Sequence, residues 1–229
     1  MMTVRKIIIV KRTNKNIIMS YRTQEILRMI IPGLYLIAMM LILFLVGNGW
    51  NKIPTKEQNT IIDVLKGASN VVVLLLPFLG FVAGYVIECL MSFFERLLYK
   101  CGLKRPSKVV LEGCKMYFIN NLKDIKKELN VRDVFNNKKA GEAFQKAKQT
   151  IQRQEVETFH DSSIMARNIL GSQIILVIYT AIYVGPLSKK LGIMLVLLVI
   201  LSLYWYHKNC IYVKYVLSEY YKTSNKKAN

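Results

Sequence analysis

The stretch Met29–Val46 reads MIIPGLYLIAMMLILFLV and contains no charged side chain. An apolar helix of about 20 residues is long enough to cross the ~30 Å hydrocarbon core of a bilayer. Three further apolar stretches follow, at Val71–Phe94, Ile169–Gly185 and Leu191–Tyr206. Together the four stretches predict an all-α integral membrane protein with four transmembrane helices.

Composition agrees with a membrane protein. Hydrophobic residues make up 53% of the 229 residues, and they are concentrated in blocks. The alternative is that the last two stretches form a buried helical hairpin in a soluble domain. Because the basic residues around all four stretches are concentrated on one side of such spans, we favour four spans.

The basic residues are distributed unevenly between the two sides of these spans. Of 33 Lys and Arg residues, seven precede the first stretch, sixteen lie between the second and third, and five follow the fourth. The other two connections together hold five. Connections rich in Lys and Arg stay on the cytoplasmic side. We therefore expect a membrane protein with both terminal segments and the long central insertion in the cytoplasm.

This topology divides the chain into five parts, and we expect the first apolar stretch to be retained as a span and not removed as a signal peptide. The parts are a basic N-terminal segment (1–28), a first transmembrane pair (29–95) with an outer loop (47–68), a basic helical cytoplasmic insertion (96–168), a second transmembrane hairpin (169–208) and an aromatic, basic cytoplasmic tail (209–229).

Local patterns predict several helices and their ends. Pro54, Thr55 and Glu57 form a helix-start signature, which predicts a short outer helix through Asn59–Lys66. We place Pro32 in the first turn of the first span, where its missing N–H has little effect.

In the insertion, apolar residues from Val110 to Leu129 recur at helical spacing and predict one amphipathic helix. A second helix is expected from Lys139, with Ala140, Ala143, Ala147 and Ile151 on one face, continuing without interruption into the third span over about 45 residues or ~65 Å. Lys222–Asn229 reads as a disordered tail.

Polar and small residues inside the spans identify a candidate pore or crevice. Glu88 is an ionisable group within an apolar stretch, which marks a functional site by default. The alternative is an ion pair with Arg96 or Arg167 that fastens the second span to the third. Gly80 and Gly84 would let another helix approach closely. At the depth of Glu88, the third span carries polar residues that predict either a wet crevice or interhelical hydrogen bonds: Asn168, Ser172 and Gln173.

The insertion carries the candidate surface for a cytoplasmic ligand or partner. Anionic lipid headgroups could neutralise much of its positive charge. The more specific interpretation is that it binds a nucleotide or an oligonucleotide. The residues are Lys138, Lys139, Lys146, Lys148, Arg153 and Arg167.

Motifs for catalysis or metal binding are weak. His160, Asp161, Ser162 and Ser163 contain the residue types of a catalytic triad, but adjacent residues on a helix point about 100° apart. The four cysteines lack the C-x-x-C spacing of a zinc site. We predict neither an enzyme nor a bound cofactor.

Two stretches, Gly80–Glu88 (GFVAGYVIE) and Phe159–Asn168 (FHDSSIMARN), and the order of the spans resemble small four-span membrane proteins of bacterial anti-phage systems. These are the Hailong-type membrane effectors and the Kiwa membrane component. The resemblance implies an oligomeric channel or a membrane sensor. In the Hailong case it further implies a soluble nucleotidyltransferase whose short DNA product controls the channel.

Two functional hypotheses follow. The first is a channel or membrane-disrupting effector in anti-phage defence, gated from the cytoplasm by a polyanionic ligand or a co-encoded soluble protein. Four spans with so few polar side chains cannot enclose a wide pore alone, so this hypothesis requires a homo-oligomer such as a tetramer. The second is a non-conducting anchor or sensor that recruits a soluble defence protein through its basic cytoplasmic surface.

Overall fold

A computed structural model describes Thr23 and residues 26–43, 54–67, 69–131, 136–151, 154–183 and 188–228 of the chain. These residues form helices and connections, without a strand among them. The chain divides into two compact units, Met1–Ile87 and Glu88–Asn229, with the division inside helix α3.

Four helices are long and apolar enough to cross a membrane, at Ile26–Leu43, Leu74–Lys100, Val156–Tyr183 and Lys189–Ser224. The prediction of an all-helical chain with four candidate spans is therefore confirmed.

The first unit contains the helix Ile26–Leu43, helix α2 (Thr55–Gly67) and the first part of α3 (Ser69–Lys100). Helix α2 confirms the short helix predicted after Pro54. In contrast, the first span is already helical from Ile26, so Pro32 lies inside the helix and not in its first turn, and that prediction is wrong. Pro32 is buried in this position.

Glycines allow α3 to approach the first span at backbone contact. A Cβ built on Gly84 would lie 1.8 Å from the carbonyl oxygen of Met29, and one on Gly33 would lie 1.8 Å from the oxygen of Gly80. No side chain fits in such a space, so the interface requires glycine at these positions. Gly80 and Gly84 therefore serve helix packing in this unit.

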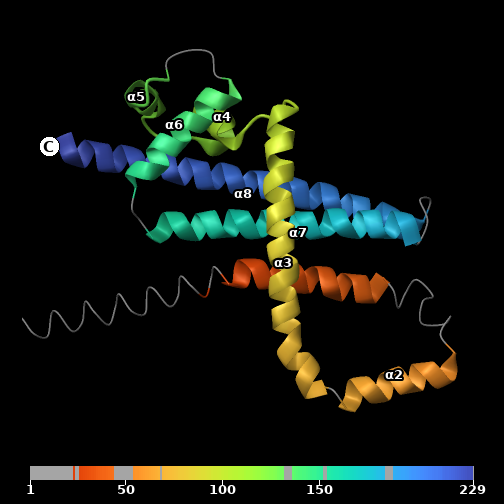
Figure 1. The fold of residues 1–229 in the computed structure, drawn as a ribbon. Helices are drawn as coiled ribbons and strands as arrows, with labels where there is room; N and C mark the ends of the chain where they lie inside the picture. Colours follow the sequence, from red (N-terminus) through yellow and green to blue (C-terminus); the bar gives the residue numbers. More distant parts are fainter. Residues whose placement is uncertain are drawn as a thin grey trace, which may run out of the picture. The chain divides into compact units, whose positions relative to one another are not determined.

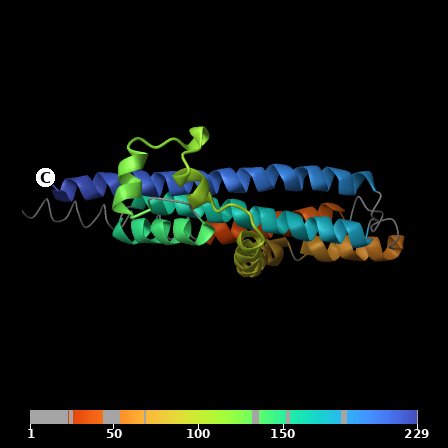
Figure 2. The same ribbon diagram turned by 90° about the horizontal axis from the view of Figure 1, so that it is seen from above.

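The second unit is built on two long antiparallel helices that lie side by side, α7 (Gln154–Tyr183) and α8 (Lys189–Ala228) (Figures 1 and 2). Helix α8 has 40 residues, so it is about 60 Å long, twice what a bilayer core requires. Large apolar side chains are exposed at the end near the α7–α8 connection, for example Ile182 at 69% and Ile193 at 61%. We call this end the membrane hairpin, because it belongs to two of the candidate spans.

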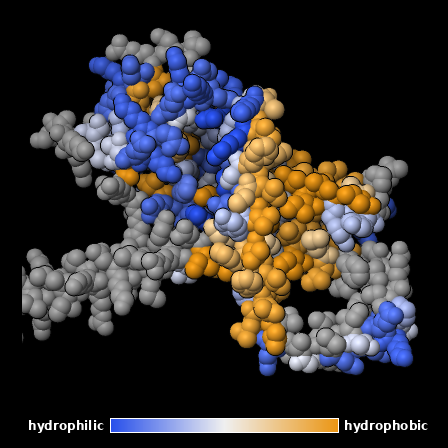
Figure 3. Space-filling view, viewed as in Figure 1, coloured by the Kyte–Doolittle hydropathy of each residue, from blue (hydrophilic) through white to orange (hydrophobic). Residues whose placement is uncertain are grey.

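The other halves of α7 and α8 carry a polar module, which we define as α4 (Pro106–Leu111), the short 3-10 helix η2 (Lys115–Tyr117), α5 (Leu122–Glu128) and α6 (Asn137–Thr150). In the space-filling view its surface is hydrophilic, whereas the hairpin end of α7 and α8 is hydrophobic (Figure 3). The core of the module also takes in α8, through side chains at helical spacing: Cys210, Val213, Val216, Leu217 and Tyr220.

Three details of the second unit differ from the sequence predictions. The predicted helix Val110–Leu129 is three short pieces, because Gly113 (φ 85°) and Asn121 (φ 61°) have left-handed backbones that end one helix and precede the next. Lys222–Ala228, predicted to be disordered, continues α8, and its start is held by a hydrogen bond from the ammonium of Lys222 to Glu219.

The third difference is the long helix expected from Lys139 into the third span. Helix α6 ends at Thr150, and Ile151 has an extended backbone (φ −106°, ψ 119°) with its side chain in the module core. The apolar face of α6 is the predicted one, since Ala140, Ala143 and Ala147 are buried. Because this short helix packs on both α4 and α8, the chain must turn before α7. The continuous element is therefore α8.

Aromatic residues are frequent in α8 from Tyr204 onward. Trp205, Tyr212 and Tyr220 are only 3%, 5% and 8% exposed and lie inside the protein. Tyr204, at 45%, does remain exposed.

Candidate functional site

A partly open cavity of about 220 Å³ lies where the membrane hairpin meets the polar module. Five elements of the second unit line it: the end of α3, the start of α4, the face of α6, the first half of α7 and the second half of α8. Charged and hydrogen-bonding side chains predominate, and they include Glu95, Arg105, Lys148, Arg167 and Tyr212.

Arg167 holds one wall of the cavity through ion pairs to α3. Its Nη1 donates to Glu95 Oε2 at 3.1 Å, and its Nη2 lies 3.9 Å from Glu88 Oε1. The side chains are only 13%, 22% and 20% exposed for Arg167, Glu95 and Glu88. Asn168 adds a long contact, from Nδ2 to Glu88 Oε2 at 3.4 Å. Of the partners proposed for Glu88, Arg167 is the one observed.

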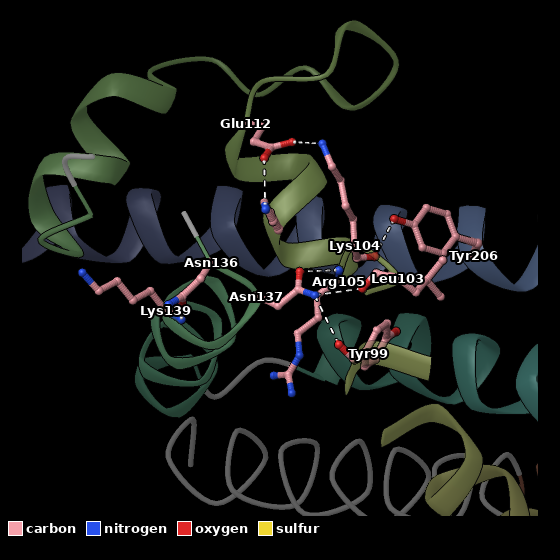
Figure 4. A network of polar contacts seen from close by, with 10 residues as sticks. Tyr99, Leu103, Lys104, Arg105, Glu112, Asn136, Asn137, Lys139 and Tyr206 are labelled. Carbon is pink, nitrogen blue, oxygen red and sulfur yellow. Dashed lines mark hydrogen bonds and ion pairs between the residues drawn. The ribbon is translucent and has the colours of Figure 1, made fainter. Parts of the chain in front are cut away.

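Arg105 also lines the cavity, and a hydrogen bond of its backbone positions it. Its N–H donates to Asn137 Oδ1 at 3.0 Å, and Asn137 Nδ2 donates to the carbonyls of Leu103 (2.9 Å) and Tyr99 (3.5 Å) (Figure 4). The guanidinium extends away from this network (Figure 4) and lies 5.4 Å from the centre of the Tyr99 ring. A Cβ on Gly141 would lie 2.3 Å from Arg105 Nη1, so the glycine makes room for this charge.

We predict that Asn137→Ala lowers the free energy of unfolding by about 2 kcal/mol, since it removes three hydrogen bonds worth ~0.5–1.5 kcal/mol each. The neighbouring Asn136 only caps α6, where its Oδ1 accepts from the N–H of Lys139, and Asn136→Ala should cost about 1 kcal/mol. Thermal unfolding of the detergent-solubilised protein measures both. Equal losses would show that the bridge from Asn137 to the chain after α3 adds nothing.

Tyr212 of α8 also lines the cavity. Its ring contacts Phe144 edge to face (centroids 5.6 Å apart) and His160 (5.1 Å), and the Lys148 ammonium lies 5.9 Å from the ring centre. The side chain is 5% exposed, and its hydroxyl has no hydrogen-bond partner among the described residues. A buried hydroxyl without a partner is costly, so a ligand atom that reached this one would be stabilised.

Lys148, the cation beside the Tyr212 ring, is half-buried in the cavity lining. Burial lowers the pKa of its ammonium, and the negative charge of Glu157 partly opposes this shift. The residues that line the cavity include three basic side chains, Arg105, Lys148 and Arg167, and one carboxylate, Glu95, while Glu88 and Glu157 act on Arg167 and Lys148 from outside the lining. The lining itself therefore has a positive balance, which favours an anion.

Two further lining residues, Ser163 and Asn209, join α7 to α8 by a hydrogen bond from the serine hydroxyl to the amide oxygen. The His160 ring nitrogen Nδ1 lies 4.0 Å from Asp161 Oδ1, along the helix and outside hydrogen-bond distance. These residues line and brace the cavity, and they are not arranged as nucleophile, base and orienting acid. Among the described residues, no three His, Cys, Asp or Glu side chains are grouped to hold a metal.

The three polar residues predicted to line a pore from the third span are buried within the protein. Asn168, Ser172 and Gln173 are 0% exposed. Gln173 Nε2 donates to the carbonyl of Met194 on α8 at 2.9 Å, and the Ser172 hydroxyl donates to the carbonyl of Asn168. The bond of Gln173 is interhelical, whereas the bond of Ser172 lies within α7.

The six predicted ligand residues separate into three groups. Lys148 and Arg167 line the cavity. Lys138, Lys139 and Lys146 are exposed on α6, where the last two border a second partly open cavity of about 560 Å³ beside Val131. Arg153 lies outside the described residues.

Sequence reasoning missed Arg105, Asn137, Gly141 and Tyr212. Only Tyr212 gave a signal, because Cys210, Val213 and Leu217 continue an apolar stripe beyond the length that a span needs. The other three depend on contacts between distant segments that no local pattern encodes.

Comparison with known proteins gives no family model that matches the chain, no similar curated protein and no similar solved structure. The functional argument therefore depends on the geometry of this cavity.

Proposed function

We propose that this chain is a homo-oligomeric effector of the bacterial inner membrane that a cytoplasmic anion controls through the cavity, and that it permeabilises the membrane in anti-phage defence. The uneven distribution of basic residues supports a cytoplasmic position for the module. The exposed apolar surface of the hairpin offers contact with lipid or with further copies of the chain.

One observation carries the proposal: Arg167 both lines the cavity and pairs with Glu88 and Glu95 of α3. An anion that entered the cavity would compete with the carboxylates for the same guanidinium. Binding would thus weaken the connection between α3 and α7, two helices that contain candidate spans. A ligand shifts such an equilibrium only by binding one state better than the other, and this competition supplies the difference.

Glu95→Gln tests this mechanism without a ligand. It removes the closer carboxylate partner of Arg167, so proteoliposomes that contain the variant should show basal K⁺ efflux about tenfold above wild type, equivalent to a shift of about 1.4 kcal/mol in the closed–open equilibrium. Glu142→Gln, a change of the same charge at an exposed residue of α6, is the control and should not alter efflux. If wild type, Glu95→Gln and ligand-treated protein all fail to conduct and cross-linking finds monomers, the effector proposal is wrong.

A second candidate, a non-conducting anchor that recruits a soluble defence protein, is favoured by the exposed positions of Lys138, Lys139 and Lys146 away from the cavity. Reversal of these three charges would then abolish association with a co-encoded partner and leave K⁺ efflux unchanged. Under the effector proposal the same variant keeps wild-type control of efflux.

A further inference from the structure

We infer that the cavity binds a phosphate group, and that the bound phosphate replaces Glu95 as the ion-pair partner of Arg167. The inference deepens the proposed function, because it names the chemistry of the controlling anion and the contact that it replaces.

The donors in the cavity fit phosphate better than a carboxylate. Arg105 and Lys148 have no ion-pair partner within 4.0 Å among the described residues, while Arg167 is already paired with a carboxylate. A single carboxylate ligand would add only what Glu95 already offers. A phosphate monoester carries close to two negative charges and three strong acceptor oxygens, and can engage several cations together.

Buried donors on residues that line the cavity provide an independent reason. The hydroxyl of Tyr212 and the Nε–H groups of Arg105 and Arg167 are buried and have no hydrogen-bond partner among the described residues. Buried donors are nearly always satisfied in native proteins. An anion with several acceptor oxygens would satisfy donors of this kind, whereas an apolar ligand would satisfy none.

The size and walls of the cavity limit the rest of the ligand. At about 220 Å³ it is smaller than the ~300–1,000 Å³ of sites for drug-sized ligands. It therefore suits a phosphate with a compact substituent and not a length of oligonucleotide. Tyr99, Phe144 and Tyr212 provide flat aromatic walls, on which a ring or an aliphatic substituent would pack.

Two sources carry this chemistry, a soluble phosphate monoester of the cytoplasm and the headgroup of phosphatidic acid, since the cavity adjoins the membrane hairpin. Binding is measured on the full-length protein as ligand-induced thermal stabilisation. One arm adds inorganic phosphate or AMP to protein in dodecylmaltoside micelles, which contain no phosphate. The other compares nanodiscs of phosphatidylcholine, a phosphodiester, with nanodiscs in which part of this lipid is replaced by phosphatidic acid, a phosphate monoester.

Saturable stabilisation in the first arm identifies a soluble ester, and stabilisation only in the second identifies a headgroup. Either result supports the inference. Stabilisation in neither arm would overturn it.

Matched variants locate the binding. Lys148→Gln should weaken the affinity for the active probe about tenfold or more, because it removes a charged partner within the cavity. Lys146→Gln makes the same change at an exposed position of the same helix and should weaken it less than about twofold. Equal losses for the two variants would indicate attraction to general surface charge and would refute a phosphate site.

Two further variants have predicted signs that a merely structural role would not produce. Tyr212→Phe should weaken binding about fivefold while leaving the unliganded protein as stable as wild type or more so, because it removes a buried donor without a partner. Glu95→Gln should strengthen binding severalfold, since it removes the competitor for Arg167.

Weaker binding by Glu95→Gln would contradict the exchange. Binding without any K⁺ efflux would leave the phosphate site standing and refute only the effector proposal.

Discussion

Replacing Arg167 with methionine is expected to lower the free energy of unfolding by about 3 kcal/mol. Methionine keeps most of the length of the side chain but leaves Glu88 and Glu95 without their cation. Each carboxylate side chain is less than a quarter exposed. Removing one partner of a buried pair costs ~3–5 kcal/mol, and the partial exposure of these groups places the loss at the lower end of that range. Thermal unfolding in micelles, with urea titration where it is reversible, measures the effect.

Two controls separate this loss from a general effect of charge. Lys104→Gln removes a cation from an ion pair with Glu112 whose side chains are 60% and 36% exposed, and it should cost less than about 1 kcal/mol. The triple variant Arg167→Met, Glu88→Gln, Glu95→Gln should recover most of the lost stability, because no charge is then left without a partner. A triple variant no more stable than the single one would contradict the explanation.

Gly84→Ala is the second large effect, and it acts on the first unit. The added methyl group would lie 1.8 Å from the carbonyl oxygen of Met29 and 3.1 Å from its Cα. Backbone atoms cannot rotate away as a side chain can, so the first span and α3 must separate. We expect the variant to lose about 3 kcal/mol, at the upper end of the usual cost of overpacking, and to show much less protein in the membrane fraction.

Gly192→Ala is the matched control in another candidate span. It lies in α8 with no atom within 4 Å of the added Cβ, so it should be neutral or stabilise by up to about 1 kcal/mol through the higher helix propensity of alanine. If Gly84→Ala were as stable as Gly192→Ala, the contact between α3 and the first span would be absent in the folded protein.

The helical class and the four candidate spans could be predicted from the sequence, because hydropathy over a whole stretch is a strong signal. The apolar face of α6 was also predictable from its spacing. The ends of helices in the module were not. Gly113 and Asn121 break a periodic pattern through left-handed backbones, and the end of α6 at Thr150 depends on its packing against α4 and α8.

The candidate site was predictable only in part. Arg167 and Lys148 stood out as basic residues, and Arg167 was a predicted partner of Glu88. That Arg105 joins them depends on an asparagine 32 residues later in the chain and on the absence of a Cβ at Gly141. Such a cavity is a property of several packed segments, and periodicity in one segment cannot reveal it.

Cysteine labelling tests most directly the claim that the cavity faces the cytoplasm. Cys114 is exposed in the polar module, and Asn59 is exposed on α2. With the other three cysteines replaced by serine or alanine, single-cysteine proteins that carry either Cys114 or Asn59→Cys are treated with a maleimide that cannot cross the inner membrane. We predict that intact spheroplasts label the cysteine at position 59, and that Cys114 reacts only after the membrane is opened. Labelling of Cys114 in intact spheroplasts, with position 59 protected, would contradict the account.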